Sequence, residues 1–226
     1  MRSLLIRFLW IWILSATALA EPPPDFEIVA KFEEAPGNLT VTSDGRVIMS
    51  LHQFYEPRYS VVEVLPDKSV VPFPNAQLNE RERSGGLRLD SVLGIQAASD
   101  GMVWMLDNGL RSGVRPKLVA WDARANKLHR VIHFPESVAP ANAFLNDLVV
   151  DRLHNRIFIS DPAGGSNAAL IVVNLQSGAA RRVLEGDHSV RPENVDLVID
   201  NRPLQMMDQS GKLVRPRIGE IGRAHV

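Results

Sequence analysis

The chain has 226 residues, of which 45% are hydrophobic and 23% charged; these values are typical of a globular protein and exclude a disordered or collagen-like chain. Its 25 lysine and arginine residues balance 26 aspartate and glutamate residues, so the net charge of −1 shows no basic excess that would indicate nucleic acid binding. The lack of cysteine excludes a disulfide framework, a thiolate metal site and a cysteine nucleophile.

Residues 1–20 have the pattern of a signal peptide. Two arginines precede an apolar run, Phe8–Leu14, and Ala18-Leu19-Ala20 is a small-x-small cleavage signal. The run is shorter than the roughly 20 residues of a membrane span, and Pro22–Pro24 cannot continue a helix. We therefore expect a secreted or periplasmic protein with no stable membrane anchor after cleavage. An uncleaved N-terminal anchor is the alternative.

Residues 21–36 are expected to form an extended segment, either a linker or a strand that closes a blade. After it, short apolar runs alternate with turn signals, which predicts an all-β protein. An Asp-Gly pair separates two β-rich runs at Asp44-Gly45 and again at Asp100-Gly101. Such a pair between β-rich runs is a strong hairpin signal. A third, similar segment has a longer turn around His154-Asn155.

Each of these hairpins is followed by a second one, so the unit is four strands that recur after about 50–57 residues, the pattern of a β-propeller. An ordinary β-sandwich with chance similarity is the alternative. The predicted partial propeller spans residues 37–219. Its repeats are expected at residues 37–76, 93–136 and 145–186, with the start of a fourth around Val195.

Three repeats are fewer than the roughly four to eight blades of a propeller. We therefore expect the chain to be the N-terminal part of a longer protein. Residues 220–226 resemble the in-frame translation of a sequencing adaptor, and a natural polar tail is the alternative.

Two groups of motifs, in order along the chain, resemble the yellow / major royal jelly protein family. Trp104–Gly109 followed by Pro116–Asp122 is similar to the family's W-x-L-D-x-G … P-x-L-hydrophobic-x-[FW]-D segment. Phe144–Asp151 resembles its F-x-N-D-[IL]-x-V-D segment. The resemblance covers roughly residues 28–200, and the chain departs from the animal members in having no cysteine.

This resemblance implies a six-bladed propeller, of which about half is present here, and a truncated, bacterial-type member. The family's insect members are exported proteins tied to dopachrome conversion or to the binding of small aromatic amines. A small-molecule ligand is therefore the expected partner.

Candidate ligand-binding residues lie where the innermost strand of each repeat begins, because propellers usually bind ligands at one mouth of the central channel. Asn146 and Asp147 are the first candidates, with Asn38 and Gln96 in the neighbouring repeats. Polar residues cost free energy there unless they are paired or bind something. They would hydrogen-bond a small polar ligand or hold calcium, with Asn146 as a candidate metal ligand. Alternatively, Asn146 and Asp147 satisfy backbone groups in a turn.

Three further residues are weaker candidates for the channel mouth. Asp107 and Asp161 end the second strands at equivalent positions, and this repetition favours a structural acid in each blade over a unique catalytic one. His52, close to Phe54 and Tyr55, is a candidate general base or a histidine packed against aromatic rings. No residue is assigned a catalytic role. Asn108-Gly109 is expected to form a loop.

Three functions remain open at this point. The first is an exported propeller that binds or isomerises a small aromatic or quinonoid molecule. The second is a calcium-dependent lactonase of the gluconolactonase kind, in which an asparagine holds the metal and the metal polarises the substrate carbonyl. The third is a binding scaffold without catalysis, since a fold does not by itself imply a function.

Overall fold

The computed structural model describes residues 27–79, 86–162, 167–207 and 210–216. The predicted signal peptide (residues 1–20) and the adaptor-like residues 220–226 lie outside the described residues. In the stretches of chain that are described, no helix has the length and apolar character needed to cross a membrane.

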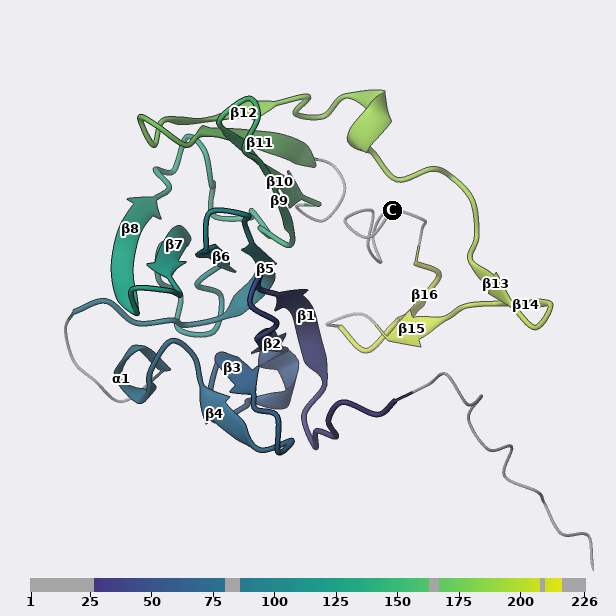
Figure 1. Ribbon diagram of the computed structural model, residues 1–226. Coiled ribbons are helices and arrows are strands. Elements are labelled where there is room, and N and C mark those ends of the chain that lie inside the picture. The colour runs from purple at the N-terminus through teal and green to yellow at the C-terminus, as the bar shows by residue number, and fades with distance from the viewer. Residues whose placement is uncertain (1–26, 80–85, 163–166, 208–209, 217–226) are drawn as a thin grey trace, which may run out of the picture.

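Three four-stranded antiparallel sheets follow one another along the chain (Figure 1). Blade 1 contains β1 (Pro36–Val41), β2 (Val47–Leu51), β3 (Val61–Val64) and β4 (Val70–Pro72). Blade 2 contains β5 (Val92–Ala97), β6 (Met102–Asp107), β7 (Lys117–Asp122) and β8 (Lys127–His133). Blade 3 contains β9 (Leu148–Asp151), β10 (Arg156–Asp161), β11 (Ala169–Asn174) and β12 (Ala180–Val183).

Within each blade the strands pair in chain order, which is a simple up-and-down meander. The first strands β1, β5 and β9 lie next to one another toward the centre, and β4, β8 and β12 lie at the periphery (Figure 1). Sheets of this kind around a common centre are the blades of a β-propeller. The predicted fold class is therefore confirmed.

The tight turns lie where the sequence predicts them. Gly45 and Gly101, between the first two strands of blades 1 and 2, have φ values of +84° and +89°. A side chain at such a φ is strained, which is why glycine follows aspartate at both turns. In blade 3 the same turn uses Asn155, at φ +53°, because asparagine tolerates the left-handed region better than most residues.

The hydrophobic core lies between neighbouring blades. Strand β6 shows how the alternation of a β-strand builds it. Val103 and Met105 belong to the cluster shared with blade 1, whereas Trp104 and Leu106 belong to the cluster shared with blade 3. The central blade thus contributes one face to each of two cores, and this fixes how the blades stand side by side.

The segment before β1 packs against the outer face of blade 1. Phe32 lies on the buried side chains of Met49, Leu51 and Val62. Lys68 Nζ donates a 2.8 Å hydrogen bond to a backbone carbonyl of the same segment. Residues 27–35 therefore cover a portion of blade 1, whereas the remainder of the predicted extended segment lies outside the described residues.

Three short elements connect or flank the blades. They are the 3₁₀ turns at Gln53–Tyr55 and His188–Val190 and the helix α1 (Ala76–Asn79). Asn79, at the end of α1, is buried, and its Oδ1 accepts hydrogen bonds from the backbone N–H groups of Ser60 and Val61. This helix thereby anchors the connection from blade 1 to blade 2.

The predicted fourth repeat takes the form of two short hairpins. They are β13 (Val198–Ile199) with β14 (Arg202–Pro203), and β15 (Met206–Met207) with β16 (Leu213–Val214). This stretch of the chain extends away from blade 3 and curves back toward β1 (Figure 1). Nearly all of its residues are exposed, so within the described ranges it does not add a fourth packed blade.

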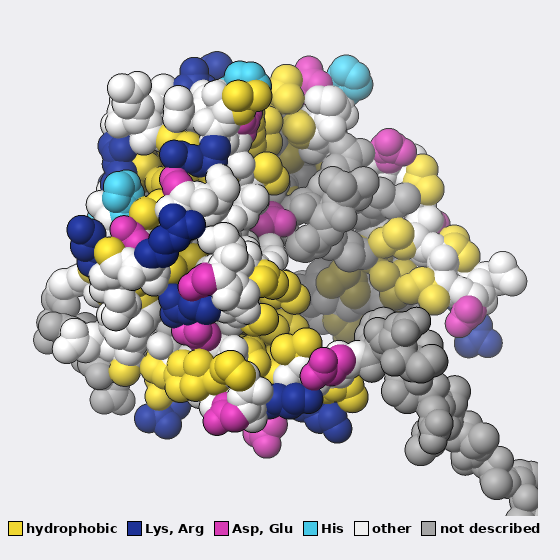
Figure 2. Space-filling view, viewed as in Figure 1, with side chains coloured by type: hydrophobic (Ala, Val, Ile, Leu, Met, Phe, Trp, Pro, Cys, Tyr) yellow, Lys and Arg dark blue, Asp and Glu magenta, His cyan; other side chains and the backbone are white. Residues whose placement is uncertain are grey.

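Charged side chains of both signs are interspersed over the blades on the face shown in Figure 2. Hydrophobic side chains are exposed near β1 on the same face (Figure 2). Leu39 and Val41 of this strand are each 55% exposed. The face of β1 that carries Leu39 and Val41 is therefore both apolar and exposed.

Candidate functional site

Asn38 and Asp147 meet where the innermost strands begin, and together with Asn146, which precedes Asp147 in the chain, they are here called the inner-strand cluster. Asn38 lies in β1, and Asn146 and Asp147 lie immediately before β9. The Nδ2 atom of Asn38 donates a hydrogen bond to Oδ1 of Asp147 over 2.9 Å. The structure thus connects candidate residues of blade 1 and blade 3 that are 109 positions apart.

Gly94 of β5 makes this contact across blade 2 possible. A Cβ atom on Gly94 would lie 2.9 Å from the Cα atom of Asp147 and 3.0 Å from the backbone nitrogen of Leu148. Both of those atoms are backbone, so they could not move aside as the end of a flexible side chain could. The missing side chain of Gly94 therefore allows the chain before β9 to approach β5 closely.

Asp147 is held on several sides. Its Oδ1 accepts a 2.8 Å hydrogen bond from the backbone N–H of Leu148 as well as the one from Asn38. Its own backbone N–H donates to Oγ of Ser160 over 3.2 Å, and its carbonyl accepts from the Ser160 N–H over 3.0 Å. Because the Asp147 N–H donates to the Ser160 side chain instead of to a backbone carbonyl, regular ladder pairing starts at Leu148. The innermost strand therefore begins two residues later than the predicted Asn146.

Asn146 differs from Asp147 in the hydrogen bonding of its side chain. Its backbone N–H donates to the carbonyl of Ser160 over 3.0 Å. The residue is half-buried, and its side-chain amide makes no hydrogen bond to the described residues of the chain. Asn146 therefore keeps one donor group and one acceptor for a ligand.

Gln96 joins neighbouring inner strands. Its Oε1 accepts a 2.7 Å hydrogen bond from the backbone N–H of Val150 in β9. Thr40 has the same role in blade 1, where its Oγ1 accepts from the N–H of Ala97 over 2.8 Å. The side-chain carbonyl of Gln96 therefore has a structural role. Thr40, which sequence reasoning missed, has the equivalent role in blade 1.

Ser50 is another residue that sequence reasoning missed. It is fully buried in β2, donates from Oγ to the carbonyl of Leu93 over 2.7 Å, and accepts from the N–H of Asn38 over 2.9 Å. Ser160 has the equivalent place in β10. The recurrence of serine just before the end of the second strand, in blades 1 and 3, was the signal in the sequence.

Asp107 and Asp161 lie inside the blades rather than in the inner-strand cluster. Asp107 is fully buried, 2.6 Å from Nζ of Lys117, and accepts backbone N–H bonds from Asp90 and Ser91. Asp161 lies 2.6 Å from Arg182 and accepts from the N–H of Phe144. Each acid holds the segment that leads into the first strand of its blade, which is a structural role.

His52 lies in the loop after β2. Its Nδ1 accepts from the N–H of Phe54 over 3.3 Å, and the two ring centroids are 4.4 Å apart. Burial lowers the pKa of His52 below the ordinary value of 6.5. In the described residues no hydrogen bond or ion pair connects His52 to the inner-strand cluster.

A calcium site at the inner-strand cluster stays a prediction. The described residues include no group of three or more His, Cys, Asp or Glu side chains placed to hold a metal ion. At Asp147, two N–H groups already point at Oδ1, and their partial positive charges disfavour a cation at that oxygen. The Asn146 amide oxygen is a further hard ligand that the cluster offers.

The three blades and their inner strands show that the chain has a β-propeller fold. Residues 90–217, more than half of the chain, match the sequence profile described as major royal jelly protein. The chain therefore belongs to the major royal jelly protein family. This confirms the resemblance seen in its motifs.

Two solved structures are similar to the chain. A virginiamycin B lyase from Staphylococcus aureus is 15% identical, with a TM-score of 0.45, over 82% of this chain and 56% of that one. The PQQ-bound form of an aldose sugar dehydrogenase from Streptomyces coelicolor is 12% identical, with a TM-score of 0.45, over 83% of this chain and 57% of that one. The chain thus spans little more than half the length of either protein. Comparison with curated protein sequences gives no match.

Proposed function

We propose that this chain belongs to an exported propeller that binds or isomerises a small aromatic or quinonoid molecule at the mouth of its central channel. The observation that carries the proposal is the inner-strand cluster. Its members are brought together from two blades by the 2.9 Å hydrogen bond between Asn38 and Asp147. Family membership and the signal-peptide pattern of residues 1–20 support the proposal.

The cluster offers polar groups of the kind that such a ligand needs. The unoccupied amide of Asn146 can donate to a quinone or carboxylate oxygen and accept from a phenol or an ammonium group. Asp147 adds a carboxylate whose Oδ1 already accepts two N–H groups, so it orders the site rather than selecting the charge of the ligand. The hydrogen bond from Asn38 keeps this carboxylate in one orientation, so that it need not be ordered when the ligand binds.

A binding experiment tests the proposal. The protein from the natural gene is titrated by calorimetry with dopa, dopamine and dopachrome, and the loss of dopachrome colour is followed in parallel. We expect at least one of these to bind, and Asn146→Ala to weaken binding by about tenfold, equivalent to about 1.4 kcal/mol. The matched control is Gln176→Ala, which removes an exposed amide in the turn between β11 and β12 and should leave affinity unchanged.

Two results would overturn the proposal. One is the absence of binding by all three compounds. The other is equal affinity in the wild type and in Asn146→Ala. Hydrolysis of a lactone that stops on addition of a calcium chelator would favour the calcium-dependent lactonase instead.

A further inference from the structure

Two adjacent methionines lie at the surface of the stretch that follows blade 3. This stretch, residues 195–207 and 210–216, is here called the arm. Met206 and Met207 make up strand β15, which pairs with β16. Consecutive side chains of a strand point to opposite faces, so each face of this hairpin carries one methionine. Met206 is 50% exposed and Met207 is 62% exposed, so both thioether side chains are open to solvent.

The arm has no packed core of its own in the part of the chain that the structure describes. The three buried hydrophobic clusters consist of residues from the blades and from segments before the arm. Hydrophobic side chains are visible on the outside of the arm (Figure 2). Its strands carry five apolar residues that are exposed over half of their surface or more: Val198, Ile199, Met206, Met207 and Leu213. Among the described residues, no second layer therefore shields the sulfur atoms of β15.

The methionines of the blades are protected by comparison. Met49 in β2 is 8% exposed and Met105 in β6 is fully buried, and each belongs to a hydrophobic cluster. Met102, at the start of β6, is half-buried and packs against the cluster shared with blade 3. Met1 lies outside the described residues. The described methionines therefore divide into an exposed pair in the arm and three shielded side chains in the blades.

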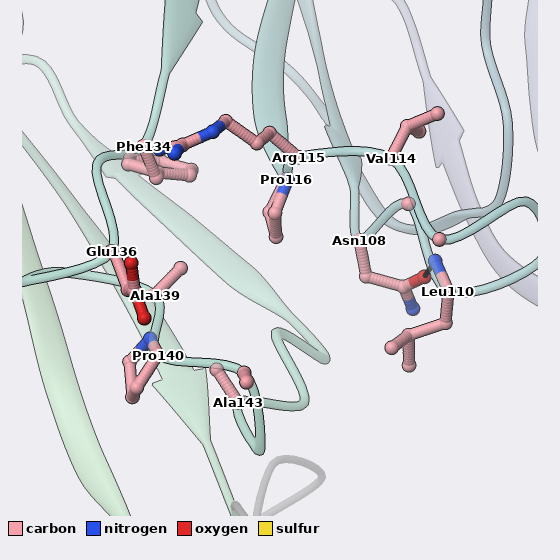
Figure 3. Close-up of a pocket in the computed structure, with 13 residues that line it drawn as sticks. Asn108, Leu110, Val114, Arg115, Pro116, Phe134, Glu136, Ala139, Pro140 and Ala143 are labelled. Carbon is pink, nitrogen blue, oxygen red and sulfur yellow. Dashed lines mark hydrogen bonds between the residues drawn. The ribbon is translucent and has the colours of Figure 1, made fainter.

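The cavity beside blade 2 does not change this division. It has a volume of about 320 Å³ and lies between the loop after β6 and the segment after β8 (Figure 3). The residues that line it include Asn108, Phe134 and Pro140 but no methionine. This cavity therefore does not bring a small oxidant into contact with Met102 or Met105.

The thioethers are the only sulfur that the chain offers to an oxidant, because it has no cysteine. A peroxide reacts with a thioether when the sulfur attacks one oxygen and the O–O bond breaks. The sulfur gives up two electrons and keeps that oxygen as a sulfoxide, while the other oxygen leaves and takes a proton to form water. A sulfoxide is polar, so it is tolerated in water and costly inside a core.

We propose that Met206 and Met207 are a modification site of this protein, oxidised by peroxides to methionine sulfoxides while Met49 and Met105 stay reduced. Both side chains of the arm already lie in water, so the added oxygens leave the blades folded. The pair consumes oxidant before the core methionines react, and the modification is reversible because reductases exist for both epimers of the sulfoxide. The site is separate from the inner-strand cluster and does not depend on the function proposed there.

Hydrogen peroxide is the probe that tests this proposal. The protein from the natural gene is exposed to it, the reaction is quenched at set times, and peptides are analysed by mass spectrometry. We expect Met206 and Met207 to gain oxygen at least about tenfold faster than Met49 and Met105, which react only after local opening of the core. The urea-unfolding midpoint should be unchanged at that stage, and the two classes of methionine sulfoxide reductase should together remove both oxygens.

A double variant tests whether the pair accounts for the fast reaction. Met206→Leu combined with Met207→Leu removes the sulfur and keeps the apolar character, so the fast uptake of oxygen should disappear. At a limiting amount of peroxide, this variant should carry more sulfoxide at Met49 and Met105 than the wild type. Met105→Leu, a volume-conserving change in the core, is the matched control and should leave the fast uptake as it is.

Three results would overturn the proposal. One is oxidation of Met49 or Met105 in the folded wild type as fast as that of Met206 and Met207. Another is the absence of fast uptake in the wild type, which would show that the arm is covered in the whole protein. The third is an equal amount of sulfoxide at Met49 and Met105 in the wild type and the double variant, which would show that the pair does not protect the core.

Discussion

The amide of Asn38 in blade 1 reaches the carboxylate of Asp147 at the entrance to blade 3, over a distance of 2.9 Å from Nδ2 to Oδ1. Blade 2 lies between these two residues in the chain, and its Gly94 has no side chain to separate them. One hydrogen bond thereby joins the first and third blades at the starts of their inner strands.

This bond predicts an energetic coupling between two distant positions of the sequence. In a double-mutant cycle with Asn38→Ala and Asp147→Ala, unfolding in urea should give a coupling energy of about 1 kcal/mol, the usual contribution of a partly buried hydrogen bond. Asn38→Ala combined with Asp67→Ala, a residue in the exposed turn between β3 and β4, should be additive. A coupling energy of zero for Asn38 and Asp147 would contradict the contact.

The buried pair of Lys117 and Asp107 should be far more sensitive than a surface pair. Lys117→Met leaves a fully buried carboxylate without its cation, so the free energy of unfolding should fall by about 3 kcal/mol. Lys68→Met removes an exposed lysine that is 3.6 Å from Glu27, and its cost should stay below about 1 kcal/mol. Equal effects of the two substitutions in chemical denaturation would show that Asp107 does not have the structural role assigned to it.

The side chain of Gln96 should protect one backbone amide from exchange with solvent. Since its Oε1 accepts the N–H of Val150, Gln96→Ala should speed hydrogen exchange at Val150 by about fivefold, equivalent to about 1 kcal/mol. The amide of Leu175, which donates to the carbonyl of Asn155 in the same blade, is the internal reference and should be unchanged. NMR-detected exchange measures both sites, and similar acceleration at both would indicate general loosening of blade 3 instead.

His52 should make the protein less stable in mild acid. Burial lowers its pKa below 6.5, so the folded state favours the neutral ring. Its contribution to stability is therefore fully present above the unfolded-state pKa of about 6.5 and is lost as the pH falls through the lower folded-state pKa. His52→Gln should reduce the loss of stability between about pH 7.5 and pH 5. A His52 titration midpoint above 6.5, measured by NMR, would contradict the assigned direction.

The blades could be predicted from the sequence because their signals are local. Gly45, Gly101 and Asn155 have the positive φ angles that their turns require, and the apolar alternation beside them sets the two faces of each blade. The motifs that carry the family resemblance are also continuous stretches of chain. Neither signal depends on contacts between distant residues.

The contacts of the candidate site could be predicted only to a limited extent. The sequence singled out Asn38, Asn146 and Asp147 by position, but the pairing of Asn38 with Asp147 depends on how three blades pack. Asn108 was expected only to form a loop, because its buried amide depends on a contact with Ser91, which lies 17 positions earlier in the chain. Partners such as these depend on long-range packing, and no local pattern in the sequence specifies them.

Binding at the inner-strand cluster can be observed at a single group, the side-chain amide of Asn146. We would record its NMR resonances while the protein from the natural gene is titrated with dopamine. The proposed function predicts that they shift and saturate together with those of Asn38, while the exposed amide of Gln176 stays unchanged. Saturable binding of dopamine with no change at Asn146 or Asn38 would place the ligand elsewhere and contradict the proposed site.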